Sequence, residues 1–440
     1  MSHMDPFAII HSPYPPVKDG SKIHKDCTLL RKFIGRLNMK KLGAILLIAG
    51  TCIGSGMIAL PMVLAKIGLI PSLILMIIIW AFVYYTSLIN LELNLQIGQG
   101  LPLGELGKRL SGKGAELIGI GSLKILSYSL LAVYIYGGSS IVQKLLASKM
   151  EVNASIETIA TVLALCAALI LLCPIKFIDY FNRVLFMSLL GVVAILILGL
   201  AVSIKWTNLP LFSTQQIDAT TWMAIIPVVF TSFGFQVIFH TLTNYCQKNT
   251  TMLKQAFFWG SLIPAIVYLL WTSSVLSVVF HENPTFYVKM MEGQAEVGAL
   301  IEVLSTIAKW KMVQLLVWLI SLLAIITSII GVGIGLYDSL KEMLPQPIKQ
   351  QSLRKILATV ITIGPAYFAV LYIPNAFIAV LGFAGMILAV IAVILPIYLF
   401  WQIQTPQLHY HELKRKGLII LSFCAGLGVI VCELYNIVTS

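Results

Sequence analysis

Long apolar stretches alternate with short polar segments along this chain. A helix that crosses a bilayer needs about 20 consecutive apolar residues, because the hydrocarbon core is about 30 Å thick. By this measure the pattern predicts an all-α polytopic membrane protein with eleven transmembrane helices. The spans are expected at residues 41–66, 69–97, 115–147, 156–173, 184–203, 222–245, 255–280, 311–336, 354–371, 376–401 and 417–438.

The composition agrees with this pattern. Of 440 residues, 58% are apolar and 11% are charged, whereas a soluble domain carries about a quarter charged residues. An ordinary soluble enzyme is therefore excluded. The seven cysteines include no CxxC pair, so neither a zinc site nor a disulfide framework is indicated, and no cofactor is expected.

The positive charge is distributed in a way that predicts orientation. The net charge is +12, and 22 of the 30 Lys and Arg residues fall on one side of the predicted spans, eight of them within residues 1–41. Cytoplasmic segments carry such an excess. We expect a cytoplasmic N-terminus, a periplasmic C-terminus after eleven spans, and no nucleic-acid partner.

Two spans are interrupted near their midpoints by glycine and small polar residues. Span one contains Gly50, Gly54 and Gly56 within seven residues, and the middle of span six runs from Phe230 to Gln236. Glycine in a helix interior costs about 1 kcal/mol, so local unwinding is predicted. Unwound backbone within a bilayer is tolerated where it lines a protein cavity or binds a ligand.

The two breaks have matching positions in a predicted repeat of two five-helix units. Spans one to five (residues 41–203) and six to ten (222–401) would form two five-helix units, inverted in the membrane because each unit has an odd number of helices. The span at 417–438 lies outside the repeat. Unwound helices present N–H groups to an anion and carbonyls to a cation, as an amino acid zwitterion requires. The alternative is that the glycines serve close helix packing.

The same residues resemble a known family. The stretches 50–61 and 226–235 are similar to those of the hydroxy and aromatic amino acid permeases, in particular the bacterial tyrosine-specific transport proteins. Further similar stretches are 85–92, 179–183, 333–338 and 382–385. After Phe235 the tyrosine permeases continue with His-Gly, whereas this chain has Gln236-Val237, which leaves the exact substrate open.

The resemblance implies a fold, a function and a site. It implies a leucine-transporter-like fold within the amino acid, polyamine and organocation superfamily, and proton-driven import of tyrosine or tryptophan across a bacterial inner membrane. The substrate's carboxylate and amine would meet the backbone around span one, and the segment from Phe230 would line the side-chain pocket. The implied residues are Gly50, Thr51, Ile53, Gly54, Ser55 and Gly56, then Phe230, Thr231, Ser232, Phe233, Gly234 and Phe235, with Tyr128 and Tyr134 of span three expected nearby.

Charged residues inside spans are candidates for ion coupling, because a charge at the bilayer centre costs about 2.5 kcal/mol or more. Glu92 is predicted either to handle protons or pair at an inner gate, or to lie at the membrane interface. Lys124 is predicted either to replace a coupling cation or to extend toward the headgroups. Glu433 is expected at the interface.

Span eight offers a second coupling candidate. Ala324, Thr327 and Ser328 share one helical face, a spacing that resembles the sodium site of sodium-coupled relatives. A bound sodium ion at Thr327 and Ser328 is one interpretation, and hydroxyls bonded back to their own helix are the other. The coupling ion, proton or sodium, stays open.

One segment between spans is also amphipathic. Apolar residues recur at helical spacing near residues 295–308, which predicts a helix acting as an outer gate or resting on headgroups. A symporter that uses alternating access is the function expected. The alternative is a symporter for a branched-chain or other neutral amino acid, for which sodium is a candidate coupling ion. An enzyme or a channel is disfavoured, because the intramembrane acids are scattered and two short breaks supply no continuous pore.

Overall fold

A computed structural model describes residues 40–439 except 98–99, 215–216, 308–310, 345–350, 374–376, 404–406 and most of 175–208. The described residues form helices and loops, with no β-strand among them. An unlabelled helix spans Lys40–Cys52. The remaining helices are α2 (Ser55–Leu64), α3 (Leu69–Gln96), α4 (Leu103–Ser111), α5 (Lys113–Met150), α6 (Ile156–Leu172), α8 (Ala219–Ser232), η1 (Gln236–Ile238), α9 (Phe239–Tyr245), α10 (Thr250–Glu282), α11 (Pro284–Glu292), α12 (Val297–Ile307), α13 (Lys311–Met343), α14 (Gln351–Tyr372), α15 (Phe377–Ala389), η2 (Val390–Ile394), α16 (Leu395–Trp401), η3 (His411–Lys414) and α17 (Lys416–Thr439).

Seven of the described helices are long and apolar enough to cross a membrane, and an eighth span results if the helix 40–52 and α2 are counted together. The apolar helices α6, α8 and α12 are shorter. The prediction of an all-helical, polytopic membrane protein is therefore confirmed. The count of eleven stays a prediction, because the fifth predicted span lies largely outside the described residues.

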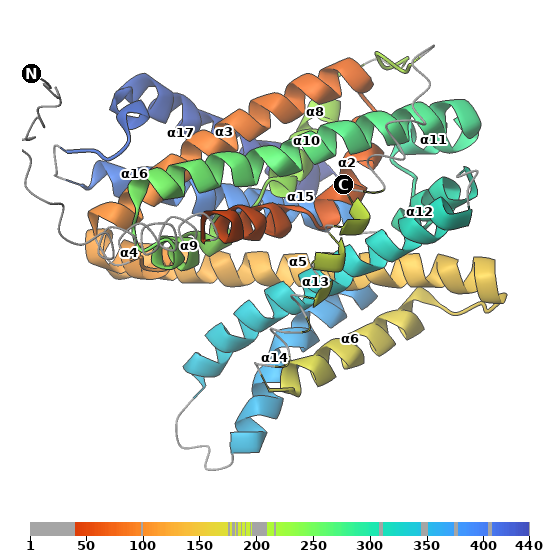
Figure 1. Ribbon diagram of the computed structural model, residues 1–440, viewed down its shortest axis with the longest axis horizontal. Helices are drawn as coiled ribbons and strands as arrows, with labels where there is room; N and C mark the ends of the chain where they lie inside the picture. Colours follow the sequence, from red (N-terminus) through yellow and green to blue (C-terminus); the bar gives the residue numbers. More distant parts are fainter. Residues whose placement is uncertain are drawn as a thin grey trace, which may run out of the picture.

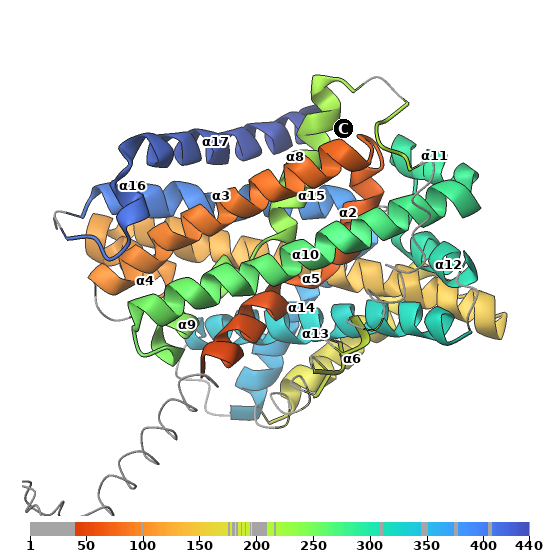
Figure 2. The same ribbon diagram turned by 45° about the horizontal axis from the view of Figure 1, so that its top comes forward.

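The helices form an elongated bundle around α5. Figure 1 shows α6 and α14 on one side of α5, α3, α10 and α17 on the other, and α13 crossing α5. The turned view in Figure 2 shows α17 along the outer side of the bundle, next to α3 and α8. The helices α8 and α15 pack against each other between these groups, so the interrupted helices lie in the interior.

Both predicted breaks are present. The helix 40–52 and α2 meet at an angle of 49°, and Gly54 between them has dihedral angles outside the helical region. The helix α8 begins at Asp218, whose side chain accepts a hydrogen bond from the Thr221 N–H, and it ends at Ser232. Residues 233–235 are not helical, and the chain resumes as η1 and α9.

Several elements follow a different pattern from the one expected. The helices α4 and α11 were not predicted, because each has only nine residues between apolar runs. A π-helix, η2, interrupts the tenth predicted span. The expected amphipathic helix is α12, and it packs on α5, where the Gly298 N–H donates to Ser140 Oγ at 3.0 Å.

Candidate functional site

Tyr268 of α10 joins the two helix breaks. Its hydroxyl lies 2.5 Å from the carbonyl oxygen of Cys52 and 2.9 Å from that of Ser232. These two residues end the first halves of the two broken helices. A hydroxyl has one hydrogen to donate, so the fully buried Tyr268 shares it between the carbonyl ends of both half-helices.

The breaks also touch directly. A Cβ added to Gly56 would lie 2.6 Å from the Cβ of Ser232 and 2.7 Å from its Oγ. Any side chain at position 56 would therefore separate α2 from α8. Gly56 lies in the first turn of α2, where its missing side chain permits this close packing, while the non-helical residues of the break are Ile53 and Gly54.

The broken helices present both kinds of backbone polar group at this contact. The first N–H groups of α2 have no partner within their own helix, and Gly54 supplies no side-chain cap. In span six the Phe235 N–H donates instead to Gln236 Oε1 at 2.8 Å. Carbonyl ends attract cations and N-terminal ends attract anions.

The aromatic residues of the second break pack into the core. Phe230, Phe233 and Phe235 are each 0% exposed. Their rings lie 5.8 Å from Phe82 of α3, 5.3 Å from Tyr268 and 5.6 Å from Phe257 of α10, respectively. A role for them as a side-chain pocket stays a prediction.

Two other residues at this break, Thr231 and Gly234, contact α15. The Thr231 hydroxyl donates to the carbonyls of Pro227 and Leu381, the second at 2.9 Å. A Cβ on Gly234 would lie 2.8 Å from Leu388 Cδ2. The second break is thus held from α10 on one side and α15 on the other.

The face of α13 that was proposed for sodium lies partly at the first break. A Cβ on Gly54 would lie 2.9 Å from Ser328 Oγ. The hydroxyl of Ser328 donates to Ala324 O at 2.7 Å, and that of Thr327 donates to Leu323 O at 2.8 Å. Bonding back to their own helix is therefore observed, while Ser328 still faces the break.

Span three contributes one of its two expected tyrosines. A Cβ on Gly54 would lie 3.8 Å from the hydroxyl of Tyr134, which places Tyr134 beside the first break. The Tyr128 hydroxyl instead donates to Ile361 O of α14 at 2.8 Å. The sequence did not identify Tyr268, although a buried tyrosine in an apolar span is itself a signal, because its hydroxyl needs a partner.

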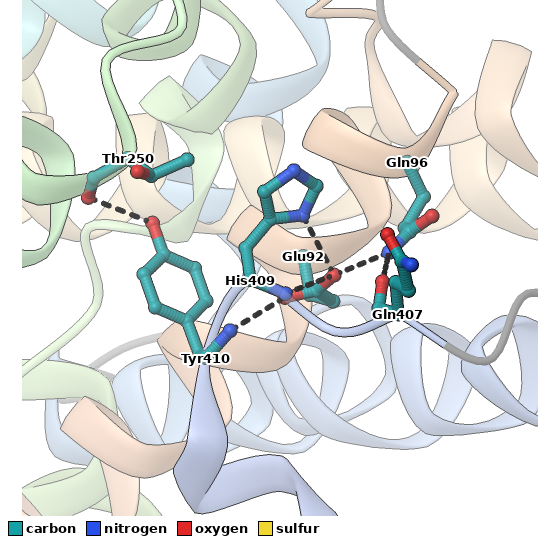
Figure 3. Close-up of polar contacts among 6 residues, drawn as sticks. All are labelled: Glu92, Gln96, Thr250, Gln407, His409 and Tyr410. Atoms are coloured by element: carbon teal, nitrogen blue, oxygen red, sulfur yellow. Dashed lines mark hydrogen bonds and ion pairs between the residues drawn. The ribbon is translucent and has the colours of Figure 1, made fainter.

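Glu92 fastens α3 to the segment before α17, as Figure 3 shows. Its carboxylate is 0% exposed and accepts from the backbone N–H groups of His409 at 3.1 Å and Tyr410 at 3.2 Å, and from Gln96 Nε2 at 2.6 Å. The His409 Nδ1 atom lies 3.0 Å away. Glu92 is therefore buried within the protein, and its partners are Gln96 and the loop residues His409 and Tyr410, not residues of the helix breaks.

The neighbouring loop residues have shifted pKa values. Burial, more than the nearby carboxylates, raises the pKa of Tyr410 well above its usual value, and the Tyr410 hydroxyl donates to Thr250 O at 3.2 Å. The hydrogen bond from the Lys254 ammonium lowers the pKa of Glu412. Both contacts tie this loop to the start of α10.

Two further charged residues lie away from the breaks. Lys124 is half-buried and contacts Met343 at the end of α13. Glu433, which the sequence predicts near the membrane interface, is 4% exposed, and its depth in the membrane stays a prediction. A Cβ on Gly382 would lie 2.6 Å from Glu433 Oε2, and Asn436 Nδ2 donates to that carboxylate at 3.1 Å. The helix α17 thus turns Glu433 toward Gly382 of α15.

The described residues include no group of three or more His, Cys, Asp or Glu side chains that could hold a metal ion. What they do contain is two broken membrane helices that meet around one buried hydroxyl. This is a membrane protein in which helix ends with free backbone N–H and C=O groups lie inside the helix bundle. A binding site for a small charged molecule within a membrane requires such groups.

The chain belongs to the tryptophan/tyrosine permease family, whose model matches residues 38–433. It is 29% identical to tyrosine-specific transport system 1 of Haemophilus influenzae over 90% of this chain and 96% of that protein. It is 28% identical to glutamine transporter 2 of Aliivibrio fischeri (82% and 88%) and 28% identical to a tryptophan-specific transport protein of Pseudomonas aeruginosa (81% and 84%). The protein is thus a transporter and not an enzyme.

Proposed function

We propose that this protein is a secondary active transporter that imports an aromatic amino acid, tyrosine or tryptophan, across a bacterial inner membrane. The observation that carries the proposal is the meeting of the two helix breaks around Tyr268. The names of its relatives support the substrate class, since they include tyrosine-specific and tryptophan-specific transport proteins.

The substrate's charged groups bind the helix ends. The carboxylate accepts from the N–H groups at the start of α2, around Gly54 and Gly56, because that end carries partial positive charge. The ammonium binds near the carbonyls of Cys52 and Ser232, which retain lone pairs beside the Tyr268 hydroxyl. The side chain extends toward the segment from Phe230 to Phe235.

The fold proposed is leucine-transporter-like, with two inverted five-helix repeats, an eleventh helix and the N-terminus in the cytoplasm. The equivalent positions of the breaks in spans one and six support it, because inverted repeats place discontinuous helices at matching points. Alternating access then consists of one group of helices rocking against the other around the breaks.

An inward proton gradient supplies the free energy. Glu92, Lys124 and the buried Glu433 are the candidates for proton coupling, because buried ionisable groups in membrane spans commonly form proton relays. The Glu433 carboxylate accepts from Asn436 Nδ2, whereas the Glu92 carboxylate accepts from Gln96 and from two backbone N–H groups, so protonation disturbs fewer contacts at Glu433 than at Glu92.

A second candidate function is sodium-coupled uptake of a branched-chain or other neutral amino acid. The specific observation that favours it is the position of Ser328 Oγ beside Gly54, since a hydroxyl and freed carbonyls are the oxygen ligands of a small hard cation. A relative named as a glutamine transporter is consistent with a neutral amino acid as cargo.

Uptake of labelled amino acids into proteoliposomes tests the proposal, with proton and sodium gradients imposed separately. Accumulation of tyrosine or tryptophan with the proton gradient alone supports it. Accumulation that requires sodium supports the second candidate. Uptake that persists after both gradients are collapsed, or no uptake of either aromatic amino acid, contradicts the first proposal.

A further inference from the structure

The helix α8, which leads into the second break, contains a proline at position 227. Proline has no backbone N–H, so the carbonyl of the residue four positions earlier loses its helical hydrogen bond. That residue is Met223, in the second turn of α8. A backbone carbonyl freed in this way within a membrane span needs a donor from another part of the protein.

The donor comes from α17. Asn436 Nδ2 lies 2.9 Å from the carbonyl oxygen of Met223 and 3.1 Å from Glu433 Oε2. Both partners are acceptors, so it is the nitrogen of the amide that faces them, and this nitrogen has two hydrogens to donate. The side chain of Asn436 therefore supplies one hydrogen to the broken helix and one to a carboxylate of its own helix.

Glu433 extends this contact to a third helix. Its side chain is buried, and a Cβ added to Gly382 of α15 would lie 2.6 Å from Glu433 Oε2 and 2.9 Å from Oε1. The carboxylate thus rests on the backbone of α15, which in turn packs on α8, where the Leu381 carbonyl accepts from Thr231. The three helices α8, α15 and α17 are joined around one amide and one carboxylate.

The helix α17 lies outside the two predicted five-helix repeats, so the repeat by itself assigns it no role. Figure 2 shows the end of α17 beside α8, and α17 packs on both α8 and α15. Its exposed side chains near this end include the apolar Leu434 and Val438, whereas Glu433 and Asn436 face the bundle. Polar and ionisable side chains within a membrane are costly and commonly functional.

We propose that Asn436 is a positioning residue for transport. It holds α8 at the carbonyl that Pro227 leaves free, and Glu433 orients its amide. Because the second break begins where α8 ends, the position of that break depends on α17. The inference goes beyond the proposed function, since it requires neither a particular substrate nor a particular coupling ion.

A double-mutant cycle tests this role. Asn436→Leu removes the donor, and Pro227→Ala restores a backbone N–H through which Met223 O regains a partner within its own helix. In the wild-type background, loss of the bond makes the competent position of α8 less populated, so KM should rise about tenfold with little change in maximal rate. In the Pro227→Ala background, Asn436→Leu should raise KM by less than about threefold, because the two changes act on one carbonyl.

Uptake into proteoliposomes is measured at equal protein content, with whichever of labelled tyrosine, tryptophan, leucine and glutamine the wild-type protein imports. Import of leucine or glutamine alone would overturn the proposed aromatic substrate but not this inference. Thr439→Val is the matched control and should leave KM unchanged, because the Thr439 hydroxyl bonds within α17.

A merely structural role for Asn436 would lower the amount of active protein and leave KM as it is. An unchanged KM in Asn436→Leu, or an equal rise in both backgrounds, would therefore overturn the inference. If the leucine variant fails to insert, Asn436→Ala takes its place and is judged by the same cycle.

Discussion

The hydroxyl of Tyr268 lies 2.5 Å from the carbonyl oxygen of Cys52. The helix α10, which carries Tyr268, therefore contacts the end of the helix 40–52 at the first break. The carbonyl of Ser232 shares the same hydrogen. The contact connects α10 to both breaks, and its loss is the most direct test of whether they act together.

Replacement of Tyr268 by phenylalanine is expected to slow uptake and lower thermal stability in detergent. The ring packing against Phe233 is kept, but the two buried carbonyls lose their common donor, at a cost of about 1–3 kcal/mol. Tyr367→Phe is the control, because its hydroxyl pairs with Thr161 on the α6 side. Equal effects of the two variants would contradict a special role for Tyr268.

Gly56→Ala is expected to reduce transport strongly, because the added Cβ meets Ser232 at 2.6 Å and overpacking costs about 1–3 kcal/mol. Adding Ser232→Gly removes the two nearest clashing atoms, Cβ and Oγ, and leaves the Cα at 2.9 Å, so it should restore part of the activity. Gly364→Ala in α14 is the control, since nothing lies within 4 Å of its added Cβ. Initial uptake rates at equal protein content measure the outcome, and the absence of rescue would argue against direct contact of the breaks.

Ser328→Ala distinguishes the two coupling ions. With proton coupling we expect most proton-driven uptake to be retained, because the Ser328 hydroxyl bonds to its own helix at Ala324 O. With sodium coupling the half-saturating sodium concentration would rise. Sodium titration of uptake, with wild type alongside, decides between them.

Glu433→Gln tests the buried carboxylate for proton coupling. The variant keeps the size and an acceptor for Asn436 but cannot release a proton. We expect loss of accumulation driven by the proton gradient, while exchange of internal for external substrate continues, because exchange requires no net proton movement. Retained accumulation would remove Glu433 from the candidates.

Glu92→Gln is expected to loosen the loop before α17. A glutamine has one oxygen, whereas the Glu92 carboxylate accepts from two backbone N–H groups and from Gln96. The loop around His409 should become more accessible to limited proteolysis. Glu105→Gln, which affects only an exposed pair with Arg109, is the control, and an unchanged cleavage rate would contradict the structural role.

Part of this protein followed from its sequence alone. The length of an apolar run sets whether a helix can cross a bilayer, and glycine with small polar residues in mid-span favours unwinding there, because both effects are local. Both breaks were therefore predictable, and their residues also carried the family resemblance that the comparisons confirmed.

Only the tertiary structure decided what meets at those breaks. Tyr268 is 36 residues from Ser232 in the chain and 216 from Cys52, and Glu92 finds its partners 317 and 318 residues away. Which of Tyr128 and Tyr134 faces Gly54, and which way Glu433 points, depends on how each helix is rotated against its neighbours. Rotation is set by the packing of many side chains together, so a periodicity within one helix does not contain it.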